Sequence, residues 1–162
     1  MKNLVLIGMM GCGKSTVGEL LARRLGRTLI DTDQFIERQA GMTIPEIFAA
    51  EGEAYFRSLE AGVAQALSLR EDLIIACGGG LPMGGGFAAL KESGTVVWLD
   101  RDPAAIFDSG ELGDRPLAQQ GREAFLRLAD ERAAAYRAAA DHIITDFTSP
   151  ISTAARVLEV ME

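Results

Sequence analysis

The chain has little of the chemistry that stabilises secreted proteins or builds metal centres. Of its 162 residues only two are cysteine and one is histidine, and 6% are aromatic. Cys12 and Cys77 lie at separate predicted strand-to-loop turns and form no metal-ligand cluster. We therefore expect a reduced, cytoplasmic setting. The single histidine, His142, opens a predicted strand, which favours a structural role over a catalytic one.

Long apolar runs and an excess of positive charge are also absent. No run approaches the length of a membrane span, and the first residues lead straight into a predicted strand. We therefore expect no membrane segment and no signal or transit peptide. The formal net charge is −7. This argues against nucleic acid or an anionic membrane surface as a partner.

What is present suits one globular domain. The chain is 48% apolar and 24% charged, which is enough for one core and too short for two domains of ordinary size. We find no internal repeat, low-complexity tract or linker. Residues 1–162 are therefore predicted to form a single domain.

The clearest motif is G-x-x-x-x-G-K-[ST], which occurs as GMMGCGKS from residue 8. An apolar run at residues 4–7 precedes it, and an apolar stripe at helical spacing follows it. Strand, glycine loop and helix form the context in which this motif binds phosphate. The loop N–H groups and the helix N-terminus attract the anion, Lys14 reaches the β- and γ-phosphates, and Ser15 holds Mg²⁺. A triphosphate requires a locally basic site on this acidic protein.

A pair of acids follows the second predicted strand, at residues 28–30. Asp31 and Asp33 are separated by one residue and directly follow this strand. In a parallel sheet, ligands bind at the edge formed by the carboxyl ends of the strands. Either both acids face the phosphate loop, or Asp33 caps the helix that begins near Gln34. The pattern alone leaves both possibilities open, and the nearby phosphate loop favours a functional role.

Three glycines at residues 78–80 follow the third predicted strand, so backbone can approach a ligand there. The segment at residues 108–119 is polar, punctuated by glycine and without an apolar repeat, which favours a mobile lid. Its only cation is Arg115. Arg57 and Arg132 lie on predicted helices, where periodicity alone favours a solvated face.

Strands alternate with helices from end to end. This predicts an α/β fold in three layers, with a parallel sheet of about five strands and helices on both faces. The predicted strands are residues 4–7, 28–30, 73–76, 96–99 and 142–144.

Together these motifs resemble the shikimate kinase family of P-loop kinases, which is similar in fold to nucleoside monophosphate kinases. The most specific part is Asp-x-Asp followed by Gly-Met-Thr-Ile-x-Glu-Ile-Phe and Phe-Arg. The residues that match the family are 8–16, 31–33, 41–48, Gly52, Glu53, Phe56, Arg57, Glu60, 78–80, 115–117, Arg132 and Tyr136.

The resemblance implies transfer of the γ-phosphoryl of ATP to the 3-hydroxyl of shikimate, giving ADP and shikimate 3-phosphate for chorismate and aromatic amino acid synthesis. It implies Mg²⁺ as cofactor, and we expect a monomer. Carried over by position, the ATP-binding residues are Gly11, Cys12, Gly13, Lys14, Ser15, Thr16 and Arg115. Ser15 and Asp31 would hold the metal, and Asp33, Arg57, Gly79 and Arg132 would bind shikimate. The catalytic residues would be Lys14, Asp33 and Arg115.

Two departures from the family pattern concern adenine. Lids of the family often carry an arginine that packs on adenine, but residues 108–114 here offer only acids, and residues 146–150 lack the arginine that some members use. The competing hypotheses are a gluconate or nucleotide kinase and a non-catalytic nucleotide-binding module. A gluconate or nucleotide kinase would share the phosphate loop but would not need Asp-x-Asp, Phe-Arg and three glycines together. A non-catalytic module would be expected to have lost Lys14 or Asp33, and both are present.

Overall fold

One parallel sheet organises the protein. The computed structural model describes residues 2–113 and 115–161, and in them five strands pair in the order β2-β3-β1-β4-β5. The strands are β1 (Asn3–Ile7), β2 (Thr28–Asp31), β3 (Leu73–Ala76), β4 (Gly94–Leu99) and β5 (His142–Ile144). All neighbouring pairs are parallel, as the alternation of strands and helices predicts.

The central strand β1 is the most buried element. Every residue of β1 is buried, because β3 and β4 flank it and helices cover both faces of the sheet. Burial on two faces explains the continuous apolar run at residues 4–7. Asn3, also buried, bonds through its side chain to the backbone of Leu67, Arg70 and Leu73.

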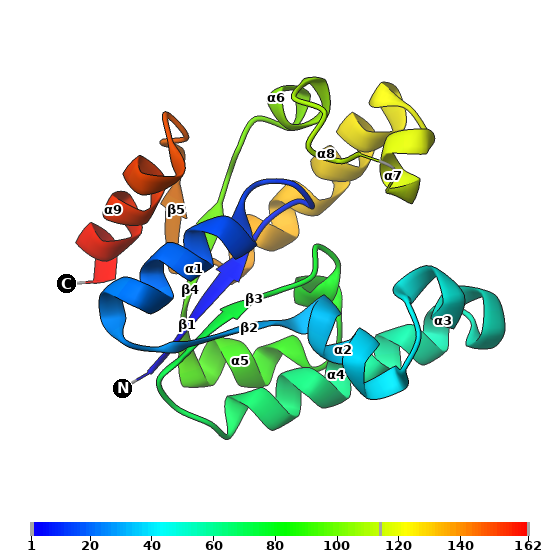
Figure 1. The fold of residues 1–162 in the computed structure, drawn as a ribbon, viewed down its shortest axis with the longest axis horizontal. Coiled ribbons are helices and arrows are strands. Elements are labelled where there is room, and N and C mark those ends of the chain that lie inside the picture. Colours follow the sequence, from blue (N-terminus) through cyan, green and yellow to red (C-terminus); the bar gives the residue numbers. More distant parts are fainter. Residues whose placement is uncertain (1, 114, 162) are drawn as a thin grey trace.

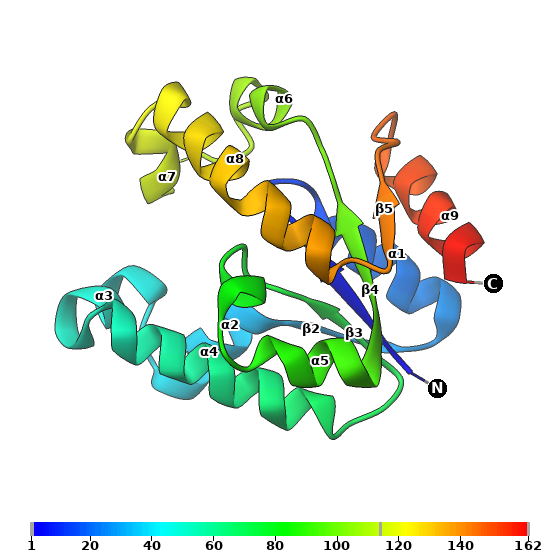
Figure 2. The same ribbon diagram turned by 180° about the vertical axis from the view of Figure 1, so that it is seen from behind.

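The helices form two outer layers, so the fold has the three layers that the sequence predicts. Helices α1 and α9 cover one face, and α4, α5 and α8 cover the other (Figures 1 and 2). The helices are α1 (Lys14–Leu25), α2 (Thr32–Ala40), α3 (Ile44–Glu51), α4 (Glu53–Ser68), α5 (Phe87–Ser93), α6 (Pro103–Asp108), α7 (Pro116–Gln119), α8 (Arg122–Ala139) and α9 (Pro150–Met161), with a 3₁₀ turn η1 at Leu81–Met83.

The strand order places a ligand site between β1 and β3. The chain leaves β1 towards β2 on one side, whereas it leaves β3 towards β4 on the other side of β1. Connections that depart in opposite directions open a crevice at the carboxyl ends of these two strands. The glycine motif at residues 8–16 follows β1, and the three glycines follow β3.

The structure settles which aspartate caps α2. Asp31 is the N-cap, and its Oδ1 accepts the Gln34 N–H at 3.1 Å. Asp33 lies inside the first turn, so the capping role that we considered for Asp33 is wrong. Thr43 and Asp102 are the N-caps of α3 and α6, where their side chains accept the N–H groups of Glu46 and Ala104.

In the part of the chain that the structure describes, no helix combines the length and apolarity needed to cross a membrane.

Candidate active site

A cleft of about 830 Å³ lies at the carboxyl end of the sheet. It is bounded by the loop after β1, the ends of β2 and β3, helices α3, α4 and α8, and the segment before α7. Nearly every residue assigned a site role from the sequence lines it. These residues are Gly11, Gly13, Lys14, Ser15, Thr16, Asp31, Asp33, Arg57, Gly79, Arg115 and Arg132.

The remaining assigned residue, Cys12, turns its side chain away from the cleft. It is 2% exposed, and its Sγ packs beneath Gly8. A contact of Cys12 with a phosphate would therefore have to use its backbone N–H, which in this structure donates to the Met9 carbonyl oxygen at 3.1 Å. Gly13 caps α1 with φ 103°, a left-handed conformation that exposes the N–H groups of the first helical turn and suits glycine.

Lys14 is folded back under the phosphate loop. Its Nζ donates to the carbonyl oxygens of Gly8 at 2.7 Å and Met9 at 2.9 Å, and it lies 3.7 Å from Cys12 Sγ. These contacts satisfy the ammonium group inside the protein. Lys14 must give up some of them to reach the β- and γ-phosphates of a bound nucleotide.

Ser15 and Asp31 meet across the phosphate loop and form a candidate magnesium site. The Ser15 hydroxyl donates to Asp31 Oδ2 at 2.7 Å, whereas Oδ1 of the same carboxylate caps α2. Mg²⁺ in kinases is held by one or two protein oxygens, water and the substrate phosphates. One hydroxyl and one carboxylate beside a phosphate loop fit that coordination. Among the described residues, no group of three or more His, Cys, Asp or Glu forms a separate metal site.

Asp33 occupies an environment that disfavours its charge. Burial raises the pKa of Asp33 to about 6, and the nearby charges of Asp31 and Glu60 act in the same direction, while Lys14 opposes them. A carboxylate with a pKa near neutrality is matched to proton transfer at physiological pH. Strongly shifted acids in clefts are candidates for catalysis.

The three glycines after β3 make room for three side chains. A Cβ on Gly78 would collide with the Asp33 carboxylate, one on Gly79 would lie 2.9 Å from an Arg132 guanidinium nitrogen, and one on Gly80 would lie 2.6 Å from Arg57. The space freed by these glycines is therefore filled by the protein's own acid and arginines. The sequence indicated the close approach, but not that its partners come from α2, α4 and α8.

Glu60 is a site residue whose role the sequence did not reveal. It is 4% exposed, and its Oε1 accepts from Arg57 Nη1 at 2.6 Å. Burial raises the pKa of Glu60, although Arg57 and Arg132 favour its ionised form. The contact holds the Arg57 guanidinium in the cleft, which contradicts the solvated face that periodicity favours for Arg57. The helical i, i+3 spacing of Arg57 and Glu60 was the available signal.

Thr32 is a second residue of the site that the sequence did not single out. Its side chain is fully buried between the two aspartates, and its Oγ1 accepts the Gly78 N–H at 2.9 Å. A bond between residues 46 positions apart has no local sequence signal.

The segment before α7 is anchored on the phosphate loop. Leu112 is 2% exposed and packs where a Gly11 side chain would lie. Arg101, another residue the sequence did not single out, donates to the Gly11 carbonyl at 3.3 Å and to Glu111 at 2.9 Å. Arg115 is exposed and lines the cleft, and it occupies the N-cap position of α7 without a capping hydrogen bond from its side chain.

The structure describes the contacts of one of the two aspartates at the ends of residues 108–114. Asp108 pairs with Arg122 Nε at 3.1 Å. Asp114 lies outside the described residues.

The charge of the cleft differs from the basic site that we expected. The described lining residues include four basic side chains, of Lys14, Arg57, Arg115 and Arg132. They also include five acidic ones, of Asp31, Asp33, Glu37, Glu60 and Glu111. Because these charges nearly balance, the protein by itself does not neutralise a triphosphate here. A bound divalent cation would supply the missing positive charge.

A parallel sheet with a Lys-Ser phosphate loop at its switch point, and with acids and arginines facing that loop, defines a P-loop kinase. Comparison with known proteins gives the family. The family model described as shikimate kinase matches residues 10–162, and the chain belongs to this family.

Individual relatives agree. A shikimate kinase of Persephonella marina is 38% identical over 160 residues, which is 98% of each chain. One from Symbiobacterium thermophilum is 40% identical over 99% of this chain and 96% of its own. The solved structure of shikimate kinase from Acinetobacter baumannii in complex with shikimate superposes with a TM-score of 0.90 at 37% identity, covering 99% of this chain and 93% of that one.

Proposed function

We propose that this protein transfers the γ-phosphoryl group of ATP to the 3-hydroxyl of shikimate, with Mg²⁺ as cofactor, on the route to chorismate. The observation that carries the proposal is the single cleft that joins a Lys-Ser phosphate loop to Asp33, Arg57 and Arg132. A monomeric state and a cytoplasmic setting stay predictions.

On the nucleotide side, the residues have separable tasks. The backbone of residues 11–16 and the N-terminus of α1 bind the triphosphate, with Lys14 reaching its terminal phosphates. Ser15 and Asp31 would hold Mg²⁺, which would supply positive charge against the terminal phosphates of the nucleotide when bound. Arg115 moves onto the γ-phosphoryl group with the lid at residues 108–119 and stabilises charge that spreads in the transition state.

On the acceptor side, the arginines bind the carboxylate of shikimate, since planar guanidinium groups match a carboxylate bidentately. Asp33 orients the acceptor hydroxyl and takes its proton as the bond to phosphorus forms. Gly79 contributes backbone to the ring of the substrate. Phosphoryl transfer requires mainly positioning and charge stabilisation, and these residues supply both.

The test is a coupled assay of ADP release with shikimate, and with gluconate as the matched acceptor control. We expect Mg²⁺-dependent turnover with shikimate and a product phosphorylated at the 3-hydroxyl by NMR. Preference for gluconate would assign the chain to the competing sugar-acid kinase activity. ADP release from neither acceptor would favour a non-catalytic module.

Base recognition gives a separate prediction. No arginine is present at residues 108–114 or 146–150 to stack on adenine. We therefore expect appreciable turnover with GTP, because backbone and apolar contacts discriminate bases weakly. The measurement is kcat/KM for ATP and GTP at saturating shikimate. A preference for ATP beyond about a thousandfold would show that specific hydrogen bonds read the base.

The environment of Asp33 predicts a stability effect in the metal-free protein. Its pKa rises from 3.8 in the unfolded chain to about 6 in the fold, so the ionised carboxylate opposes folding above pH 6. This penalty shrinks as the pH falls from 6 towards 3.8. We expect Asp33→Asn to stabilise the protein at pH 8 by about 1 to 3 kcal/mol.

Thermal unfolding with a chelator present, at pH 8 and pH 5, measures this effect. The gain should be smaller at pH 5. The control is Asp130→Asn, which changes an exposed carboxylate on α8. An Asp33→Asn variant that is less stable than the parent at pH 8 would contradict the effect of burial.

A further inference from the structure

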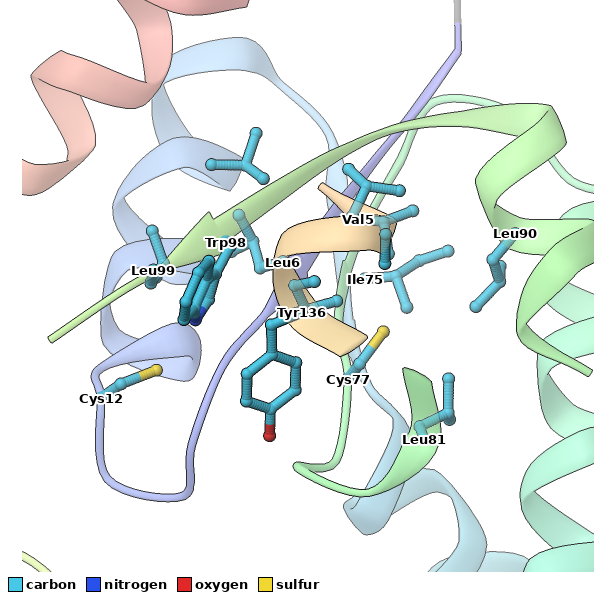
Figure 3. Close-up of a cluster of buried hydrophobic side chains, with 14 of the residues drawn as sticks. Val5, Leu6, Cys12, Ile75, Cys77, Leu81, Leu90, Trp98, Leu99 and Tyr136 are labelled. Atoms are coloured by element: carbon cyan, nitrogen blue, oxygen red, sulfur yellow. The ribbon is translucent and has the colours of Figure 1, made fainter. Parts of the chain in front are cut away.

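Tyr136 joins three parts of the active site. It is 1% exposed on α8, and its hydroxyl donates to the carbonyl oxygen of Gly79 at 2.6 Å. The same hydroxyl lies 3.7 Å from Sδ of Met9 in the phosphate loop. Tyr136 also lies one helical turn after Arg132, so both side chains leave α8 on the same face. Figure 3 shows its ring between the phosphate loop, marked by Cys12, and the end of β3, marked by Cys77.

The loop that Tyr136 contacts has no side chains of its own to hold it. Residues 78–80 are all glycine, so this loop is positioned only through its backbone. Thr32 accepts the Gly78 N–H, and Tyr136 donates to the Gly79 carbonyl one peptide further on. Two turn bonds hold the same segment, from the Leu81 N–H to the Gly78 carbonyl and from the Met83 N–H to the Gly80 carbonyl. Of these four bonds, only those of Thr32 and Tyr136 come from side chains, and they tie a glycine segment of high conformational freedom to α2 and α8.

The hydroxyl is a permanent donor. Burial raises the pKa of Tyr136 to about 12, so it stays protonated at any pH at which the protein functions. Trp98 supports the ring, with the two ring centroids 5.6 Å apart, and a fully buried ring has little freedom to turn. The hydroxyl is thus preorganised towards the Gly79 carbonyl oxygen, the nearer of its two acceptors.

We propose that Tyr136 is a positioning residue for acceptor binding, which holds the Gly79 backbone in register with Arg132 and the phosphate loop. The inference rests on the proposed function, in which Gly79 and Arg132 bind shikimate. A Cβ on Gly79 would lie 2.9 Å from Arg132 and 3.6 Å from both the Met10 nitrogen and the Tyr136 hydroxyl, so the Gly79 backbone is closely packed against all three. A small shift of the loop would displace the arginine and narrow the acceptor site.

The informative variant is Tyr136→Phe, which keeps the buried ring and removes only the hydroxyl. The Gly79 carbonyl would lose its donor and the loop would relax towards water. We expect the dissociation constant of shikimate to rise about tenfold, the effect of one buried hydrogen bond. MgATP affinity should stay within about twofold of the parent value, because Lys14 and the backbone of the phosphate loop are unchanged. Tyr55→Phe is the matched control, since Tyr55 is the other tyrosine and is 46% exposed.

Two measurements separate positioning from general stability. Calorimetric titration gives both dissociation constants, and hydrogen exchange of the peptide that covers residues 77–83 reports the loop without any ligand. The proposal expects faster exchange of this peptide together with selective loss of shikimate affinity. A purely structural tyrosine would weaken MgATP and shikimate equally and lower the unfolding temperature, which would overturn the proposal.

A third variant, Arg132→Lys, distinguishes failure of the proposal from failure of the proposed function. If Arg132→Lys weakens shikimate binding and Tyr136→Phe does not, the acceptor site stands and the role of Tyr136 is overturned. If neither variant changes shikimate affinity while loop exchange accelerates in Tyr136→Phe, the tyrosine holds the loop but the loop is not part of the acceptor site. That result would overturn the placement of shikimate and, with it, the inference.

Discussion

We expect Asp33→Asn to lower the rate of phosphoryl transfer to shikimate by about a hundred- to ten-thousandfold, the range for a positioned acid or base. Asparagine keeps the size of the side chain and can still hydrogen-bond, but it cannot take a proton. The structure strengthens this expectation because Asp31, not Asp33, caps α2. Asp33 is left in the cleft, with a pKa raised to about 6 by burial and neighbouring acids.

Single-turnover transfer and MgATP affinity, measured on the same variant, separate the possible roles of Asp33. MgATP affinity should hardly change, because Lys14 and the backbone of the phosphate loop are intact. The dependence of the reaction on Mg²⁺ should persist, because Ser15 and Asp31 remain. Near-normal transfer would reduce Asp33 to a structural acid. Loss of MgATP binding would place Asp33 in the metal site. Asp130→Asn, on the exposed side of α8, controls for a change of net charge.

The second large effect is expected at the lid. Arg115→Ala should lower kcat by about a hundred- to a thousandfold, the loss typical of one transition-state donor, with much less effect on the dissociation constant of shikimate. Arg115 lines the cleft, yet its side chain is exposed. A contact made mainly after closure is realised in the transition state, and such contacts act on kcat.

The measurement is kcat by steady-state kinetics and shikimate affinity by direct titration. Arg127→Ala is a suitable control, since Arg127 is an exposed arginine on α8 outside the cleft. Equal losses in kcat and in shikimate affinity would show that Arg115 binds the ground-state substrate. Arg115→Lys should restore part of the rate, because a point charge replaces some of the guanidinium interaction.

The lid also shows where sequence patterns lose information. Residues 108–119 have no apolar repeat, so the sequence predicts a loose segment. In the structure Leu112 is buried on Gly11, and Arg101 connects Glu111 to the same loop. One apolar residue without a periodic partner gives no pattern to detect, although its burial depends on a contact with a residue about a hundred positions earlier.

The glycines after β3 illustrate the same limit. Three consecutive glycines behind a buried strand indicate that something approaches closely, but not what approaches. The structure shows that Asp33, Arg132 and Arg57 each occupy the space of one glycine Cβ. These side chains come from three different helices, so no spacing in the sequence relates them.

The sequence by itself determined the phosphate loop, the five strands and the family, because the interactions responsible lie within a few residues. A turn, a helix cap and an apolar periodicity each depend on residues that are close together in the sequence, so a sequence pattern can reveal them. Only the tertiary structure decided the strand order, the choice of Asp31 over Asp33 as cap, and the contacts of Thr32 and Tyr136 with the glycine loop. Those contacts join residues 46 and 57 positions apart, where packing and burial, rather than local propensity, select the partner.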